Sequence, residues 1–401
     1  MDRSKLIIGT YFYGKNLYTD EHMRNLADMG VDFIVGIPSD KEVLDLCEKY
    51  GVKVLLSSTV PAWWGDNGQN AGGYAEKFPL EELDEIKKTY PSHPAIWGDY
   101  PVDEPNAKDF VHINAVIKRY EELFPGQIAF INLYPNYASV LPSADSDAVS
   151  QLGNVTYLEH IEQYAREIEG DYICFDSYPY GSVFAGYLQN LDDVSSVCRK
   201  TGRDMWVIVQ TGAWKPEALL DEFQLRWQVN LCLAYGAKSI MHACYSHGWW
   251  DPATSCVDDD GNRNPTYYYA KNVNADLRAL SDTFMKYTHL GVKVYGNAAE
   301  AEARISPQLT AQTARGEFAG WNDIKIQADG AVVAGFFECE GKRAVMLVAT
   351  ADPFCAHTPS KAYICAEGMS IRAHDGGNII GFSDSCCLNI KSGYGIFIEL
   401  E

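Results

Sequence analysis

Acidic residues lie at the end of one apolar segment in the first third of the sequence. The segment Ile96–Pro105 reads IWGDYPVDEP. Because Pro105 has no N–H to donate to a central ladder, we expect a strand that ends near Glu104 and leaves this carboxylate at the rim of a sheet. The alternative is that Asp103 caps a following helix and Glu104 lies in its first turn. Acids on a central strand are costly unless a site uses them, so the segment favours Glu104 as a catalytic residue.

Strand geometry divides the other polar side chains of this segment between two faces. Regular alternation predicts Asp99 and Asp103 on one face and Tyr100 and Glu104 on the other, unless a bulge changes the count. We predict that Asp99 and Asp103 contact a substrate. Glu104 is the predicted catalytic member of the group.

A second segment also ends in an acid followed by a proline. Residues Tyr172–Tyr180 read YICFDSYPY, with Asp176 near the end. We predict Asp176 as a second catalytic or binding carboxylate; the alternative is that it bonds backbone amides at the rim. Asn132 and Gln210 end two further apolar segments. Their neutral amides suit hydrogen bonds to hydroxyl groups better than proton transfer, which predicts substrate binding.

Aromatic residues are frequent at or just beyond the ends of the predicted strands. Sugar rings present apolar C–H faces that pack on aromatic planes, while their hydroxyls seek Asp, Asn and Gln. Two Trp-Trp pairs lie in long loops, Val60–Pro79 and His247–Pro265, where a single Trp would more often belong to the core. The aromatic residues predicted to bind substrate are Tyr11, Trp63, Trp64, Tyr178, Tyr245, Trp249 and Trp250.

Eight short apolar segments alternate with amphipathic stretches over residues 1–289, and this alternation predicts a (β/α)8 barrel. Active sites of such barrels lie at the carboxyl ends of the strands, where the residues above fall. Short alternating segments over residues 290–401 predict a small antiparallel β-sandwich. The predicted barrel strands are Leu6–Phe12, Phe33–Pro38, Lys53–Thr59, Ile96–Glu104, Gln127–Tyr134, Asp171–Tyr178, Met205–Gln210 and Ser239–Tyr245.

The stretch Gly98–Pro105 is similar to the fourth-strand signature of clan A glycoside hydrolases, including family 42 β-galactosidases and family 5 relatives. The resemblance implies that Glu104 donates a proton to the leaving oxygen and that Asp103 takes the place of an Asn that usually holds the sugar 2-hydroxyl. In that clan a Glu ends the seventh strand as the second carboxylate, whereas here Gln210 falls at that position. Asp176 is the predicted replacement, and whether it attacks carbon or activates water stays open.

We therefore expect a glycoside hydrolase that is exo-acting on a gluco- or galacto-configured oligosaccharide or glycoside, since long loops can close one end of a cleft. Two alternatives stay open: a carbohydrate-binding barrel without hydrolytic activity, which Gln210 favours, and a lyase or isomerase acting on a sugar acid. No metal or other cofactor is predicted, because no HxH pair follows the first strand and no nucleotide-binding glycine loop is present.

Composition narrows the range of partners. A net charge of -21 repels nucleic acid and anionic membrane surfaces. No window approaches the roughly 20 apolar residues that a bilayer span needs. The 11 cysteines are scattered and several lie in apolar runs, which predicts a reducing compartment and a cytoplasmic location unless an export signal has been removed. The sequence does not predict an oligomeric state.

Overall fold

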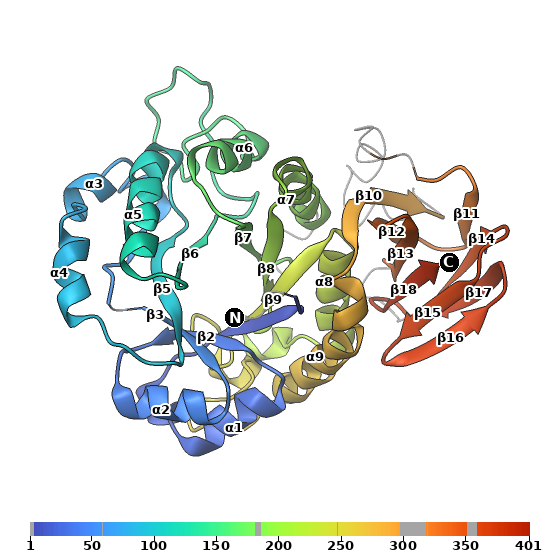
Figure 1. The fold of residues 1–401 in the computed structure, drawn as a ribbon, viewed down its shortest axis with the longest axis horizontal. Helices are drawn as coiled ribbons and strands as arrows, with labels where there is room; N and C mark the ends of the chain where they lie inside the picture. The colour runs from blue at the N-terminus through green and yellow to red at the C-terminus, as the bar shows by residue number, and fades with distance from the viewer. Residues whose placement is uncertain are drawn as a thin grey trace.

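The computed structural model describes residues 4–57, 59–180, 186–246, 248–296, 318, 320–350 and 359–401. Eight parallel strands form a ring surrounded by helices (Figure 1), which confirms the predicted (β/α)8 barrel. Neighbouring strands pair in chain order, β9 returns to β1, and a bridge from Leu133 to Phe175 links β6 to β7. The barrel strands are β1 (Ile7–Tyr11), β2 (Phe33–Ile37), β3 (Lys53–Leu56), β5 (Ile96–Asp103), β6 (Ile128–Asn132), β7 (Tyr172–Ser177), β8 (Asp204–Gln210) and β9 (Ala237–Ala243).

Amphipathic helices cover the outside of the ring (Figure 1). Local sequence fixes several of their ends: Thr156 and Glu159 form a capping box at the start of α6, and Gly202 ends α7 with a φ of 70°. The helices are α1 (Asp20–Asp28), α2 (Lys41–Lys49), α3 (Tyr74–Lys77), α4 (Glu82–Thr89), α5 (Phe110–Leu123), α6 (Tyr157–Glu167), α7 (Tyr187–Thr201), α8 (Glu222–Ala234) and α9 (Pro265–Phe284). In the described part of the chain, no helix has the length and apolar character to cross a membrane.

Large aromatic side chains fill the interior of the barrel toward the amino ends of its strands. Trp206 lies at the centre, with its ring centroid 4.2 Å from that of Tyr172, 5.8 Å from Trp97 and 6.5 Å from Phe33. These rings are buried together with Phe130. Because these rings fill the interior toward the amino ends, a site for a ligand is expected at the carboxyl ends of the strands.

The C-terminal part of the chain forms two antiparallel sheets with a core between them, which confirms the predicted β-sandwich. Cys386 is buried and Cys387 is exposed, as expected of neighbours on one strand. The six-stranded sheet contains β10 (Thr288–Tyr295), β12 (Val332–Cys339), β13 (Lys342–Ala349), β18 (Gly395–Leu400), β15 (Ile371–Asp375) and β16 (Asn378–Phe382). The three-stranded sheet contains β11 (Ile324–Ala328), β14 (Ser360–Ala366) and β17 (Ser385–Ile390).

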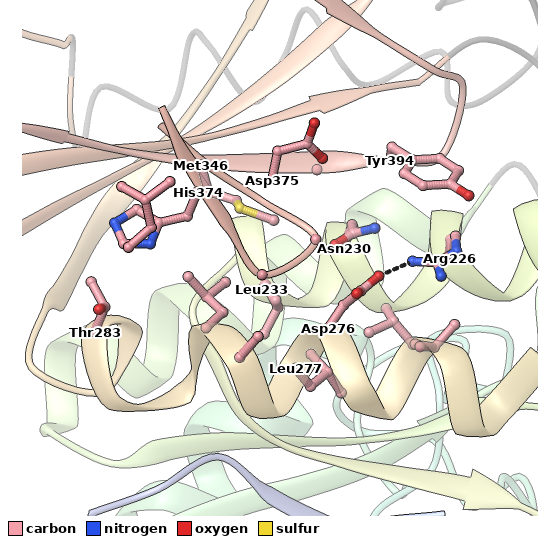
Figure 2. A pocket seen from close by; sticks show the side chains of 18 residues that line it. Arg226, Asn230, Leu233, Asp276, Leu277, Thr283, Met346, His374, Asp375 and Tyr394 are labelled. Carbon is pink, nitrogen blue, oxygen red and sulfur yellow. Dashed lines mark hydrogen bonds and ion pairs between the residues drawn. The ribbon is translucent and has the colours of Figure 1, made fainter. Parts of the chain in front are cut away.

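The sandwich packs against the outer face of α8 and α9 (Figure 1). A Cβ at Gly335 of β12 would lie only 2.0 Å from the carbonyl oxygen of Ala234, so glycine permits this close approach. A small pocket remains at the junction, where Arg226 of α8 pairs with Asp276 of α9 and stacks on Tyr394 of the sandwich (Figure 2). This pocket lies on the outside of the barrel helices and is separate from the strand ends.

Ser58 and His247, which fall in a predicted strand and a predicted loop, lie outside the described residues, as do 297–317, 319 and 351–358 of the predicted sandwich.

Candidate active site

Three carboxylates from two barrel strands meet at the mouth of the barrel. Asp103 ends β5, Glu104 follows it, and Asp176 lies near the end of β7. Asn132, at the end of the intervening strand β6, donates from Nδ2 to Asp103 Oδ1 at 3.1 Å and to Asp176 Oδ1 at 2.9 Å. One buried amide thus joins Asp103 to Asp176. We call Asp103, Glu104 and Asp176 the carboxylate cluster.

The backbone of β5 departs from regular alternation just before the cluster. Its register against β6 shifts between Asp99 and Val102. The shift turns Tyr100 and Asp103 toward the same side, where their side chains share a hydrogen bond. The predicted division of faces is therefore wrong, because a bulge changes the parity of the strand.

Glu104 itself has an uncommon backbone conformation. Its φ is +46°, in the left-handed region that non-glycine residues rarely adopt, and its N–H donates to the carbonyl oxygen of Asn132 at 2.8 Å. Such a conformation costs on the order of 1–3 kcal/mol and persists where surrounding contacts enforce it, often at functional sites. The positive φ is an observation independent of the sequence motif, and it makes Glu104 a candidate functional residue.

Trp64 holds the side chain of Glu104. The two-residue strand β4 (Trp63–Trp64) pairs with the end of β5, opposite Val102 and Asp103. From there Trp64 Nε1 donates to Glu104 Oε2 at 3.2 Å, while 45% of the Trp64 side chain stays exposed. Trp64 therefore contacts the carboxylate and keeps a ring surface open toward the mouth.

Gly65 packs directly behind Glu104, which leads to a testable expectation. A Cβ at this position would lie 2.2 Å from the Glu104 carbonyl oxygen and 3.0 Å from the Tyr134 hydroxyl, although φ of −63° would suit alanine. Gly65→Ala is therefore expected to displace the Glu104 backbone and to lower kcat about tenfold or more, in line with the cost of misplacing a reacting group. Gly381→Ala, where a Cβ meets open space, should leave the rate unchanged. A normal rate for Gly65→Ala would show that this packing does not position Glu104.

Burial raises the pKa values of all three acids of the carboxylate cluster, and repulsion by neighbouring acids adds to the shift of Glu104 and Asp176. Desolvation, followed by the charges of Asp176 and Asp103, raises the pKa of Glu104 to about 9. Desolvation also raises the pKa of Asp176, to about 7, against the lowering effect of the Asn132 hydrogen bond. The pKa of Asp103 is likewise raised by desolvation, and hydrogen bonds from Tyr100 and Asn132 oppose the shift. The arrangement can keep a proton on Glu104 while a neighbouring acid is ionised, which is the division that acid catalysis requires.

Aromatic side chains line the mouth beside the cluster. The hydroxyls of Tyr11 and Tyr100 lie 3.0 Å apart, and Tyr178 hydrogen-bonds Asp176. Trp249 is half-buried, with its ring centroid 5.3 Å from that of Tyr11 and 5.9 Å from that of Tyr178. Trp250 is buried behind them, and its Nε1 donates to the carbonyl oxygen of Ala243 at 2.7 Å. Trp250 thus supports the wall rather than offering a free face to a ligand.

Three residues expected to contact a substrate lie elsewhere. Asp99 is fully buried, within 3.4 Å of the Val60 amide, on the face of β5 toward the tyrosines of the helix layer. Trp63 stacks on Tyr74 of α3 with 5.0 Å between centroids. Tyr245 is fully buried, and its hydroxyl lies 2.8 Å from His22 Nδ1. All three pack between the strands and the helices, so the expectation for them does not hold.

The side chain of Gln210 forms hydrogen bonds with backbone groups of the neighbouring loops. Its Oε1 accepts from the N–H of Tyr180 at 2.9 Å, and its Nε2 donates to the carbonyl oxygen of Gly212 at 3.0 Å. The side chain is buried, so the structure does not place it in the mouth as the predicted hydrogen-bond partner of a sugar.

Gln210→Ala is expected to lower the free energy of unfolding by about 1–3 kcal/mol, because it removes three buried hydrogen bonds from the side chain to the backbone of Tyr180 and Gly212. Chemical denaturation measures the loss, with Gln69→Ala, at an exposed glutamine, as the control. Full stability of the Gln210 variant would contradict this structural role.

Two tyrosines outside the set predicted to bind substrate lie beside the cluster. Desolvation, followed by the charges of Asp176 and Glu104, raises the pKa of Tyr137, which is 43% exposed. Desolvation, followed by the charge of Glu104, also raises the pKa of Tyr134, which is buried. Both follow the end of β6, so the signal used for the other aromatic residues could have found them.

One group of possible metal ligands occurs among the described residues, at the opposite end of the barrel strands. The ligating atoms of Asp45, Glu48 and His93 lie within 4.8 Å of one another, but Asp45 already pairs with Lys41 at 2.7 Å. The group resembles an ordinary surface ion-pair network and is not connected to the carboxylate cluster.

Comparison with known proteins identifies the fold. No protein-family model matches the sequence, and no curated protein is similar to it in sequence. A solved structure described as a glycoside hydrolase is similar over 99% of this chain and 92% of its own, with a TM-score of 0.54 and 10% identity. A glycoside hydrolase of family 5 from Bacteroides vulgatus is similar over 98% of this chain and 89% of its own, with a TM-score of 0.50 and 10% identity. This chain has the fold of these two glycoside hydrolases. At such low identity the likeness establishes the architecture of both domains and leaves the similarity to family 42 a prediction.

Proposed function

We propose that this protein hydrolyses a glycosidic bond at the carboxylate cluster. The observation that carries the proposal is the state of Glu104: an acid with a raised pKa, held in a strained conformation at the end of β5, beside two further carboxylates. Two carboxylates that flank a glycosidic bond are the usual requirement for its hydrolysis. The glycoside hydrolases of the same fold support the proposal.

In the proposed mechanism, Glu104 donates its proton to the leaving oxygen as the C–O bond breaks. Asp176, ionised, stabilises the positive charge that develops at the anomeric carbon, or attacks that carbon, or activates water. Asn132 orients Asp176 through the 2.9 Å hydrogen bond. Aromatic rings, above all Trp64 and Trp249, offer surfaces on which the C–H face of the sugar can pack.

The proposal extends to the substrate and to the position of cleavage. We propose an oligosaccharide or glycoside substrate, gluco- or galacto-configured, cleaved from the chain end. The β4 loop, whose Trp64 contacts Glu104, supports a pocket closed on one side. We further propose a reducing, cytoplasmic environment, since each cysteine in the described part of the chain is a free thiol and most of them are buried.

The raised pKa values lead to an expected pH dependence. Asp176 must lose its proton, so kcat/KM should rise as pH passes about 7; Glu104 must keep its proton, so kcat/KM should fall as pH passes about 9. The expected profile is a bell with its maximum between these values, whose limbs belong to the coupled cluster. Asp103→Asn removes one negative charge beside Glu104 and should move the alkaline limb to lower pH. A maximum below pH about 5 would contradict this electrostatic description.

A panel of aryl glucosides and galactosides, with oligosaccharides alongside, tests the function. The proposal expects release of the aryl group or of a terminal sugar by the wild-type protein. Proton NMR of the first product anomer then distinguishes attack by Asp176 from activation of water, since the first retains and the second inverts the anomeric configuration.

One observation favours a second function, a carbohydrate-binding barrel without hydrolytic activity. The side chain at the end of β8, Gln210, is an amide bound to backbone groups and contributes no carboxylate to the mouth. If sugars bind with measurable affinity but none of the panel is hydrolysed, the binding protein becomes the better description.

A further inference from the structure

The carboxylate cluster has no cationic neighbour among the described residues. The groups that contact it or shift its pKa values are neutral donors or other acids: Trp64, Asn132, Tyr100 and Tyr178 donate hydrogen bonds. No salt bridge to Asp103, Glu104 or Asp176 occurs in the part of the chain that the structure describes. Among the described residues, only neutral hydrogen-bond donors therefore offset the cost of removing these three acids from water.

Hydrolysis of a glycoside accounts for two of these acids. Glu104 serves as the proton donor and Asp176 as the second carboxylate, in the function proposed above. Asp103 then takes part neither in proton transfer nor at the anomeric carbon, and it stays available to bind the substrate. Its placement is nonetheless fixed by the Asn132 amide at 3.1 Å and by the Tyr100 hydroxyl, so that it is as firmly held as the other two.

Asp103 can still accept hydrogen bonds from a ligand. A carboxylate offers about four acceptor positions, and the two protein donors fill part of that capacity. The residue is half-buried at the end of β5, so part of it stays accessible at this end of the barrel. Removing a carboxylate from water without a cation is costly, and a ligand that brings N–H groups or positive charge reduces that cost.

The same electrostatics exclude one class of sugar. A uronate or a sulfated sugar would add a fourth negative charge next to three acids, with no described base to neutralise it. A neutral sugar hydroxyl would satisfy Asp103 with an ordinary hydrogen bond. A protonated amine is the stronger donor for a desolvated carboxylate, because it also supplies positive charge. An amide N–H is a donor without lone pairs of its own, which suits a group that can only accept.

We propose that the sugar unit held at the carboxylate cluster carries a nitrogen substituent, either a free amine or an N-acylamino group, whose N–H donates to Asp103. The proposal rests on the proposed function in one respect, that the cluster holds a sugar. It adds the substrate class: sugars with a nitrogen substituent, in place of sugars that carry only hydroxyl groups or an acidic group.

Isothermal titration calorimetry of the intact wild-type chain with monosaccharides tests this without any turnover. The probes are glucose and galactose, their 2-amino and 2-acetamido derivatives, and glucuronic acid. A charge-assisted hydrogen bond predicts that at least one nitrogen-bearing sugar binds about tenfold or more tightly than the parent of the same configuration. Added salt should weaken a preference for the free amine and leave a preference for the acetamido sugar almost unchanged. The salt dependence therefore distinguishes the two kinds of nitrogen substituent.

Asp103→Asn should reduce the preference to below about threefold, since an amide side chain binds N–H and O–H donors with similar strength. Asp99→Asn, an acid of the same strand outside the cluster, is the matched control and should keep it. The proposal fails if glucose, galactose or glucuronic acid binds as tightly as the nitrogen-bearing sugars, if none of the latter binds, or if Asp103→Asn keeps the preference. Hydrolysis of neutral glycosides combined with such a failure would leave the proposed function standing.

Discussion

Replacing Glu104 by Gln is expected to lower kcat for a glycoside with an ordinary alcohol leaving group about 10³-fold, within the usual range for loss of a general acid. Gln has nearly the same volume and can still accept from Trp64, so the loss should come from the missing proton rather than from misfolding. Steady-state rates of the wild-type protein and the variant, measured at the pH optimum, give the ratio.

The control for this substitution is Asp99→Asn on the same strand. Asp99 also has a raised pKa, from burial, but it lies on the helix side of the barrel. Its replacement should change kcat less than about threefold, provided that circular dichroism shows a folded protein. An equal loss in both folded variants would mean that the effect is not specific to the mouth of the barrel and would remove the case for Glu104.

The second large effect is expected from Asp176→Ala. If Asp176 stabilises or attacks the anomeric carbon, its removal should lower kcat by about 10³-fold or more. Azide can occupy the space of the missing carboxylate and attack in its place, so azide should restore part of the rate and form a glycosyl azide that NMR detects. A residue that merely supports the fold would not give this rescue.

Asp176→Asn gives a second measurement of the same role. Removing its charge should lower the pKa of Glu104, because Asp176 is the larger of the two neighbouring charges that raise it. The residual activity of the variant should therefore decline at lower pH than that of the wild-type protein. Ser177→Ala, at the next residue of β7, controls for disturbance of the strand. An unchanged alkaline limb would contradict the proximity of Asp176 to the acid.

The barrel could be predicted from the sequence because its strands are buried on both faces and appear as continuous apolar runs. The prediction Ile96–Glu104 differs by one residue from β5, and Gln127–Tyr134 extends β6 by one residue before it and two after it. Pro105 identified the end of β5, and with it the position of Glu104. These features depend on the types of residues that are neighbours in the chain, so they can be recognised in a single sequence.

The division of side chains between the mouth and the helix layer could not be predicted. Trp63 and Trp64 are adjacent, yet one stacks on Tyr74 and the other contacts Glu104, because the pairing of β4 with β5 sets which residue faces inward. Asp99 lies outside the cluster for a similar reason, the register shift within β5. Both outcomes depend on neighbouring strands rather than on the segment itself.

The role of Gln210 shows the same limit. Position alone suggested contact with a sugar, but the side chain binds the backbone of Tyr180, thirty residues earlier. Asn132, also an amide at a strand end, does lie in the site, between Asp103 and Asp176. Both side chains are amides at the end of a barrel strand, and the long-range contacts distinguish them.

The most direct test of Glu104 as the general acid compares two leaving groups in the wild-type protein and in Glu104→Gln. A phenyl glycoside needs a proton on its leaving oxygen, whereas a 2,4-dinitrophenyl glycoside leaves without one. We expect the rate ratio between wild type and variant to be about 10³ for the first substrate and below about 10 for the second. The same ratio for both substrates, or full activity of the variant on the phenyl glycoside, would contradict the assignment of the proton to Glu104.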